Sequence, residues 1–131
     1  MKKILIPGLA AGVVILVASL VLMQAFEALI PGLAAEYRTP LFRPWSDPLM
    51  MLFFLYPFVL GVSFAWLWLK TKKVWESPYE MALAYFTVAT IPGMFATITS
   101  MPYSFAMVAT WTLGGLIYVL CAAIVTDKMK A

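Results

Sequence analysis

The amino-acid sequence predicts an all-α membrane protein, a four-transmembrane-helix up-down-up-down bundle with both termini cytoplasmic. Hydrophobic residues make up 64% of the chain and charged residues only 11%, whereas soluble domains have roughly 45–50% and 25%. Four apolar stretches each reach the about 20 residues that a helix needs to cross the hydrocarbon core of a bilayer. Because these runs are continuous and do not alternate with polar residues, they predict helices and not the strands of a membrane barrel.

A single domain accounts for residues 1–131. The predicted spans cover about 4–33, 49–69, 79–101 and 105–126, with an outer loop at 36–48 and a cytoplasmic loop at 70–78. The first span starts like a signal peptide, MKKILIPG, but its apolar run is longer than the roughly 7–15 residues of a cleaved signal. We expect it to be retained as a signal anchor, with cleavage after LAA, before Glu36, as the alternative.

Basic residues predict the orientation. Seven lysines flank the spans on one side of the predicted topology, namely Lys2, Lys3, Lys70, Lys72, Lys73, Lys128 and Lys130. The other side holds only Arg38 and Arg43. Because basic loops stay in the cytoplasm, this bias predicts a multi-pass protein of the cytoplasmic (inner) membrane with both termini inside. Topology thus explains the net charge of +3, and nucleic acid is not an expected partner.

Capping signals mark where the later spans begin. Ser77 and Glu80 form the pattern of a capping box, with proline at the first helical position. Ser46 or Asp47, also followed by proline, predicts a similar start for the second span, and Ser104 is a weaker cap for the fourth. The connections between spans are short, so we expect helices that are consecutive in sequence to be neighbours in space.

The hexapeptide IPGLAA occurs at Ile6–Ala11 and again at Ile30–Ala35, with a looser copy, IPGMFA, at Ile91–Ala96. A true duplication would extend the similarity further, yet the residues that follow the first two copies have nothing in common. We therefore interpret the pair as the two ends of one helix, because proline is tolerated in a first turn and Pro-Gly marks a stop.

Small residues form a stripe along every predicted span. They are Gly8 and Gly12 in the first, Gly61 and Ala65 in the second, Ala89, Gly93 and Thr97 in the third, and Thr110 and Gly114 in the fourth. Inside lipid, helices approach closely where small side chains let their backbones touch. Since all four spans carry a stripe, we expect contacts within the bundle, with a dimer face as the alternative.

Pro57 and Pro92 fall near the middle of the second and third spans. A proline there removes one backbone hydrogen bond and kinks the helix. Transporters use broken helices at the membrane midplane to expose carbonyl groups to a substrate, whereas many membrane helices simply tolerate proline. We expect two helix kinks of structural origin, with a hinge function as the alternative.

Glu27, with Gln24 one helical turn earlier, is the carboxylate that a span could bury. A helix that begins at Ile4 leaves Glu27 roughly 6 Å beyond the hydrocarbon core, whereas a helix that runs on to Leu33 and tilts buries it. A buried carboxylate needs a cationic partner, or its pKa rises.

The two cations on the same side are Arg38 and Arg43. An ion pair between Glu27 and either arginine, fastening the outer loop to the bundle, is the leading hypothesis, because a guanidinium can hold a carboxylate with two parallel hydrogen bonds. The alternative is a small polar pocket for a ligand on the extracytoplasmic side. It would be formed by Glu27 and the arginines together with Tyr37, Trp45 and Asp47.

The sequence carries no pattern typical of an enzyme. It has no histidine, and Cys121 is its single cysteine, so Ser-His-Asp sets, cysteine pairs and the commonest metal ligands are absent. Glu27 with Asp47 is the one pair of carboxylates that acid-base chemistry could use. We predict neither a metal nor a cofactor.

Three segments resemble a known family. They are LFR in the outer loop, YPFVLGVSFAWLWLKTK across the second span, and TIPGMFATITSMPYSFAMVATWTLGGLI across the third and fourth. The chain is similar over most of its length to an uncharacterised family of small four-span integral membrane proteins of bacteria and archaea. The resemblance implies the four-span fold and brings no activity or catalytic residue.

Two classes of function follow. The first is a non-enzymatic accessory or scaffold subunit of a larger membrane complex, or a homo-oligomer, because small-residue seams occur without catalytic chemistry. The second is a small transporter or channel that acts as an oligomer, with Glu27 as its coupling or selectivity group and the two prolines as hinges.

Overall fold

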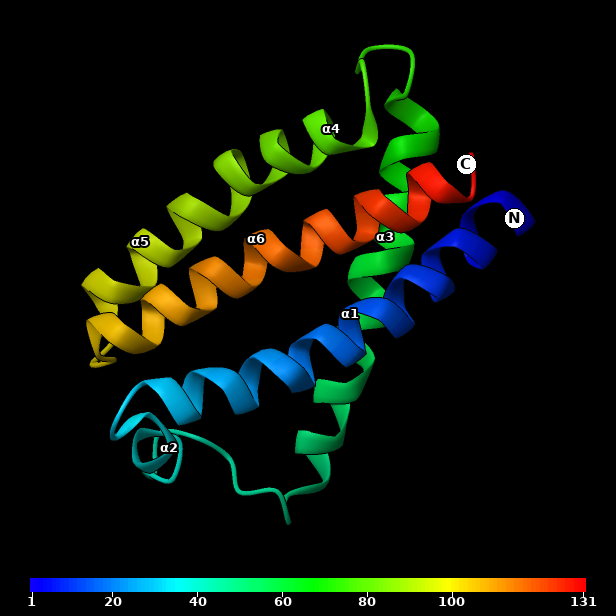
Figure 1. Cartoon of the computed structure of the whole chain (residues 1–131). Coiled ribbons are helices and arrows are strands. Elements are labelled where there is room, and N and C mark those ends of the chain that lie inside the picture. Colours follow the sequence, from blue (N-terminus) through cyan, green and yellow to red (C-terminus); the bar gives the residue numbers. More distant parts are fainter.

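The computed structural model describes all 131 residues, and every regular element in it is helical (Figure 1). The elements follow in the order α1 (Lys2–Leu29), α2 (Leu33–Glu36), η1 (Pro48–Leu55), α3 (Tyr56–Thr71), α4 (Pro78–Tyr85), η2 (Phe86–Thr90), α5 (Ile91–Ser100) and α6 (Phe105–Lys128). Of the two η elements, η1 is a 3₁₀-helix and η2 a π-helix.

Four helices are long and apolar enough to cross a membrane, which confirms the all-helical, four-span class. They cover Lys2–Leu29, Pro48–Thr71, Pro78–Ser100 and Phe105–Lys128, and are referred to below as the first to fourth spans. The three predicted caps are present: the side chains of Asp47, Ser77 and Ser104 accept backbone N–H groups at the starts of the second, third and fourth spans.

The first span is shorter than predicted, because α1 ends at Leu29 and not at residue 33. Ile30 is extended, as expected for a residue before proline, and Gly32 takes a φ of +83°, a left-handed conformation that favours glycine. The second IPG sequence therefore stops the helix, as predicted. The chain turns there into the short helix α2, and Glu27 lies in the last turn of α1.

Pro57 and Pro92 each lie where the helix type changes inside a span, so neither has regular α-helix on both sides, and the predicted kinks stay a prediction. Each lies in the first turn of an α-helix, α3 or α5, where the missing N–H is not needed. The helix type changes just before each proline. The Tyr56 N–H bonds three residues back to Phe53, and the Ile91 N–H bonds five residues back to Phe86.

Glycine packs α1 directly against α3, as the stripes in the first two spans predict. A Cβ added to Gly8 would lie 2.6 Å from the Cα of Val62, and one added to Gly12 would lie 2.8 Å from the Cα of Phe58. A Cβ at Gly61 would overlap the carbonyl oxygen of Gly8. No larger residue fits at this crossing without moving a backbone.

The stripe of the third span has no such contact, which corrects the expectation of a seam there. Nothing lies within 4 Å of the position where a Gly93 Cβ would be. Only Thr90 of this span meets a glycine of α6, and that glycine is Gly115. Gly114, the predicted contact, is covered by Tyr118 of its own helix.

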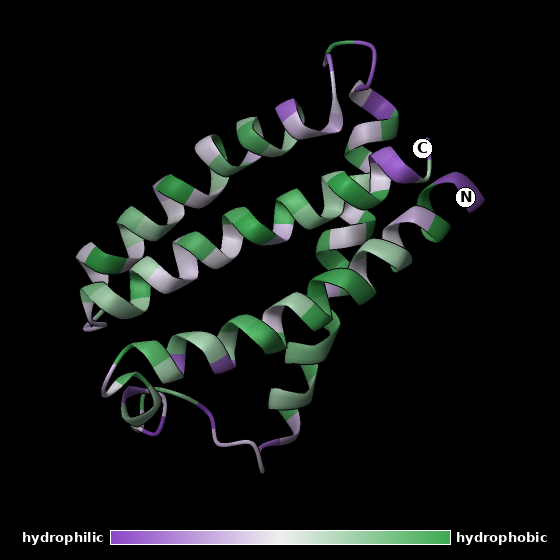
Figure 2. Ribbon diagram, in the orientation of Figure 1, coloured by the Kyte–Doolittle hydropathy of each residue, from purple (hydrophilic) through white to green (hydrophobic).

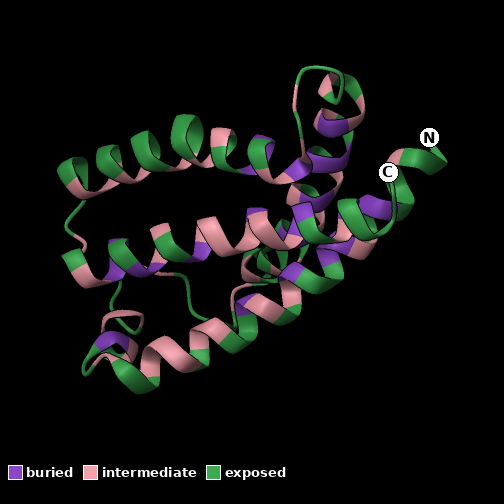
Figure 3. Ribbon diagram, turned by 45° about the horizontal axis from the view of Figure 1, so that its top comes forward, coloured by how far each residue is buried: buried purple, intermediate pink, exposed green.

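The core lies toward the end of the molecule that carries both termini (Figures 1 and 3). It is formed by Ala11, Ile15, Phe64, Trp68, Met81, Ala82, Val119, Ala122 and Ala123. Helix α6 is central, since it packs on α1, α4 and α5, whereas α3 and α4 have little direct packing although they follow each other in sequence. The third span is the least buried of the four.

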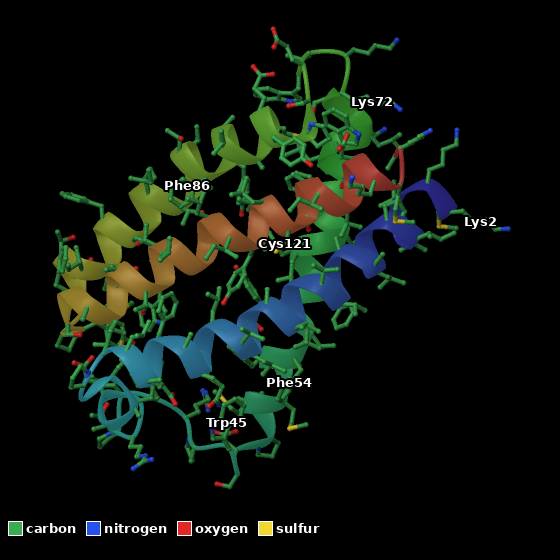
Figure 4. All side chains as sticks on the ribbon, viewed as in Figure 1. Lys2, Trp45, Phe54, Lys72, Phe86 and Cys121 are labelled. Atoms are coloured by element: carbon green, nitrogen blue, oxygen red, sulfur yellow. The ribbon has the colours of Figure 1, made fainter.

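Hydrophilic segments gather at the chain termini and in the two long loops (Figure 2). The N-terminus, the C-terminus and the loop that joins α3 to α4 all lie toward one end, where Lys2 and Lys72 project outward (Figures 1 and 4). The opposite end holds α2, the loop that leads to η1, and the turn between α5 and α6 (Figure 1).

Candidate functional site

Arg43 and Asp47 form an ion pair in the loop before η1. The distance from Arg43 Nη1 to Asp47 Oδ2 is 2.8 Å, and the other carboxylate oxygen of Asp47 accepts the Leu49 N–H at 2.9 Å. The Leu49 hydrogen bond and the Arg43 guanidinium together lower the pKa of Asp47. The pair therefore fixes the start of the second span.

The predicted ion pair of Glu27 with an arginine is not formed. Arg43 is held by Asp47, only four residues away, and closing so short a loop costs less chain entropy than reaching another helix. Arg38 is exposed and makes no ion pair. Glu27 is half-buried and Gln24 exposed on the last turns of α1, and neither forms an ion pair or side-chain hydrogen bond with the arginines or with Asp47.

Trp45, in the same loop, packs on the first turns of the second span. Its ring centroid lies 5.9 Å from that of Phe53, edge to face, and 5.9 Å from that of Phe54. Figure 4 shows Trp45 beside Phe54. Such aromatic pairs add about 0.5–1.5 kcal/mol beyond the burial of their surface, so this tryptophan stabilises the loop and does not line a pocket with Tyr37.

Four aromatic rings close the other half of the same end. Tyr37, Phe42, Tyr103 and Trp111, here named the aromatic cap, bring together α2, the outer loop, the α5–α6 turn and α6. Phe42 is central: its ring centroid lies 5.2 Å from that of Tyr37, 5.4 Å from that of Tyr103 and 6.2 Å from that of Trp111. Tyr103 lies 5.1 Å from Trp111. The aromatic cap therefore covers this end of α6.

A hydrogen bond runs through the aromatic cap. The indole N–H of Trp111 donates to the Tyr37 hydroxyl at 2.7 Å. Burial raises the pKa of Tyr37; the Trp111 bond opposes this, and the nearby charges of Glu27 and Glu36 raise the pKa further. Tyr37 therefore stays a neutral phenol at physiological pH.

Glu36 and Ser104 fasten α2 to the start of α6. The Ser104 hydroxyl donates to Glu36 Oε2 at 2.7 Å and accepts the Met107 N–H at 3.1 Å, so one hydroxyl caps the helix and binds a carboxylate. The positive N-terminal end of the α6 dipole favours a negative charge at this position. Here Glu36 takes the fastening role that was predicted for Glu27.

The loop between α3 and α4 is fastened by a second set of bonds. Ser77 Oγ accepts the Glu80 N–H at 3.2 Å, and the Glu80 carboxylate accepts the N–H of Glu76 at 2.7 Å, one residue before the position of a standard capping box. The Trp75 indole donates to the Thr71 hydroxyl at 2.9 Å. At both ends of the molecule an indole N–H thus donates to a hydroxyl oxygen, Trp111 to Tyr37 and Trp75 to Thr71.

The sequence places Tyr37 and Phe42 in the predicted outer loop, but it does not pair them with Tyr103 and Trp111 or give Glu36 a role. The sequence did contain a signal for Glu36, because this residue and Ser104, a predicted helix cap, lie on the same side of the predicted topology. The pairing itself depends on the turn at Gly32, which reverses the chain and brings α2 back to α6.

The described contacts are those of a structural clamp, without a cluster suited to catalysis. No group of three or more Asp, Glu or Cys side chains could hold a metal ion. The fold and these contacts define a helical protein with four membrane-length helices. The chain matches no family model, no curated protein and no solved structure.

Proposed function

We propose that this chain is a non-enzymatic integral membrane protein, an accessory or scaffold subunit or a homo-oligomer, that binds another membrane helix through its third span. The observation that carries the proposal is the uncovered Gly93, with nothing within 4 Å of its Cβ position. The exposed Ala96 and Ser100 lie on the same face, three and seven residues further along α5.

The contrast with the other spans supports this assignment. Gly8, Gly12 and Gly61 let α1 and α3 touch, which is the ordinary use of glycine between membrane helices. An uncovered glycine faces lipid without a side chain to fill the space, and a second helix would use the same close approach. The third span is also the least buried within the chain.

The proposed setting is the cytoplasmic membrane, with the spans running up, down, up and down and both termini in the cytoplasm. The seven lysines at one end, against two arginines at the other, support this orientation. The interacting face then lies in the outer half of the bilayer, because α5 ends at Ser100, next to the α5–α6 turn.

The test is the association state of the full chain purified in mild detergent, measured by light scattering after size-exclusion chromatography. We expect a homo-oligomer or a co-purifying membrane protein for the natural sequence, and a folded, partnerless monomer for Gly93→Leu. Phe95→Leu is the matched control, since Phe95 is exposed and lies two residues after Gly93 in α5, roughly 200° around the helix. A natural chain that is itself monomeric and partnerless would contradict the proposal.

A small transporter or channel is the second candidate, favoured by Glu27. This carboxylate lies within the first span and forms no ion pair, and such intramembrane carboxylates often couple or select ions. Four helices enclose little space, so this function also requires an oligomer. A liposome flux that disappears in Glu27→Gln, with association unchanged, would support it over the scaffold assignment.

A further inference from the structure

A shallow apolar groove separates α3 from α4. It has a volume of about 230 Å³ and is lined by Leu60, Ser63, Phe64, Trp66 and Leu67 of α3 and by Tyr85 of α4. It exists because these two helices, although consecutive, pack on α1 and α6 and hardly on each other. No ionisable carboxylate or amine lines it.

The groove lies within the hydrocarbon core. Ser63 is eight residues before the end of its span at Thr71, and Tyr85 is seven residues after Pro78. At 1.5 Å per residue, both lie roughly 10–12 Å from the helix ends on the same side. A bilayer core about 30 Å thick therefore encloses them, deeper than the ester carbonyls of phospholipids at its surface.

Two hydroxyl groups in the groove have no partner in the chain. Most other serine and threonine hydroxyls in the spans donate to a carbonyl three or four residues back, as in Ser19, Thr71, Thr87, Thr97, Thr99, Ser100, Thr110 and Thr112. Ser63 and Tyr85 form no such bond and are both exposed. An unpaired hydroxyl in hydrocarbon costs about 1–3 kcal/mol, so a ligand with an acceptor atom gains by binding here.

We propose that this groove binds a neutral, lipid-soluble carbonyl compound of the quinone type. A carbonyl oxygen can accept from the Ser63 or the Tyr85 hydroxyl, and the exposed Trp66 offers an aromatic ring at the edge of the groove to a planar ligand. The absence of charge in the groove disfavours a phosphate or ammonium headgroup, and a plain acyl chain would leave both hydroxyls unpaired. The groove is distinct from the Gly93 face, so this assignment is independent of the proposed function.

The probe is decylubiquinone, added to the full chain in detergent, with tryptophan fluorescence as the readout because Trp66 lines the groove. We expect saturable quenching for the natural chain and at least a tenfold weaker affinity for the double variant Ser63→Ala with Tyr85→Phe, since each hydrogen bond contributes about 1 kcal/mol. Thr87→Val is the matched control, because its hydroxyl already bonds Leu83 within the helix.

A second variant keeps the test independent of folding. Leu60→Trp fills the groove and leaves both hydroxyls in place, so it should remove the saturable quenching. Its thermal midpoint is measured alongside, because Leu60 also packs against the core. Quenching that rises linearly and equally in the natural chain and both variants would show only partition into detergent and would overturn the assignment. An oligomer that Leu60→Trp dissociates would overturn it as well, since a second helix would then occupy the groove.

Discussion

At the scale of single residues, indole groups hold distant segments together. Trp111 donates to Tyr37, and Trp68 donates to the carbonyl oxygen of Ala131 at 2.9 Å, which ties the last described residue to α3. Tryptophan suits this duty because its ring is apolar and its N–H is polar, so it can lie at a boundary between lipid and water and still donate. These two indole groups therefore connect α6 and α3 to segments that are distant in the sequence.

Asp47 should make the stability of the loop before η1 depend on pH. Its pKa lies below the ordinary value of 3.8 because Leu49 and Arg43 stabilise the carboxylate. A group with a lowered folded-state pKa stabilises the protein above the unfolded-state value, and this contribution is lost as the pH falls through the folded-state value. The thermal midpoint should therefore decrease when the pH is lowered below about 4.

Asp47→Asn is the matched variant for this prediction, because the amide oxygen can still accept the Leu49 N–H while the charge is removed. Thermal unfolding followed by circular dichroism between pH 6 and pH 3 measures the effect. An equal fall of the midpoint in the natural chain and the variant would assign the acid sensitivity to other carboxylates.

At the scale of elements, the two prolines occupy similar junctions but different surroundings. Pro57 follows a 3₁₀-helix and is fully buried, whereas Pro92 follows a π-helix and is exposed. The ring of Pro57 is thus part of the packing between helices, and the ring of Pro92 meets only the exterior. Their similar spacing from the span ends opposite the chain termini, nine residues from Pro48 and eight from Ser100, conceals this difference.

Replacement by alanine should separate the two prolines. Pro57→Ala leaves a cavity and should lower the free energy of unfolding by about 1–3 kcal/mol, while Pro92→Ala should leave it unchanged or raise it slightly, because alanine is a better helix former. Unfolding in detergent monitored by circular dichroism gives both values. Equal losses would mean that the prolines act through backbone geometry and not through packing.

The helix caps that were correctly predicted from the sequence depend on residues that are near neighbours in the chain. Asp47, Ser77 and Ser104 cap helices because their side chains reach amides two or three residues away, and such patterns are visible in the chain itself. The role of Glu36 depends instead on how the turn at Gly32 brings α2 to the start of α6. The Arg43–Asp47 pair is itself local, four residues apart, and was missed because the prediction paired the arginine with Glu27. Sequence alone did not supply that turn's direction, so Glu27 was given a role that Glu36 fills.

At the scale of the whole molecule, packing is uneven from end to end. The buried core lies near the termini, where α1, α3, α4 and α6 meet, while the other end is held by the aromatic cap and by the Glu36–Ser104 bond. The lysines gather at the well-packed end and the arginines at the other. One end is therefore held by apolar packing and the other by specific polar and aromatic contacts.

The orientation can be tested with single cysteines in a Cys121→Ala background. Ser46→Cys should react with a membrane-impermeant maleimide in intact cells, because it lies in the outer loop. Glu76→Cys should react only after the cells are permeabilised, since it lies among the lysines of the α3–α4 loop. Both positions are exposed, so the reverse pattern of labelling would mean that the termini face outward.

The π-helix η2 puts the two halves of the third span out of phase. A π-turn takes in one more residue than an α-turn, which rotates the following helix by roughly 100° relative to a continuous α-helix. A helical wheel drawn with 100° per residue through the whole span therefore misplaces the residues of α5 relative to those of α4. The extra residue acts as a built-in register shift between α4, which packs on α6, and α5, where Gly93 stays uncovered.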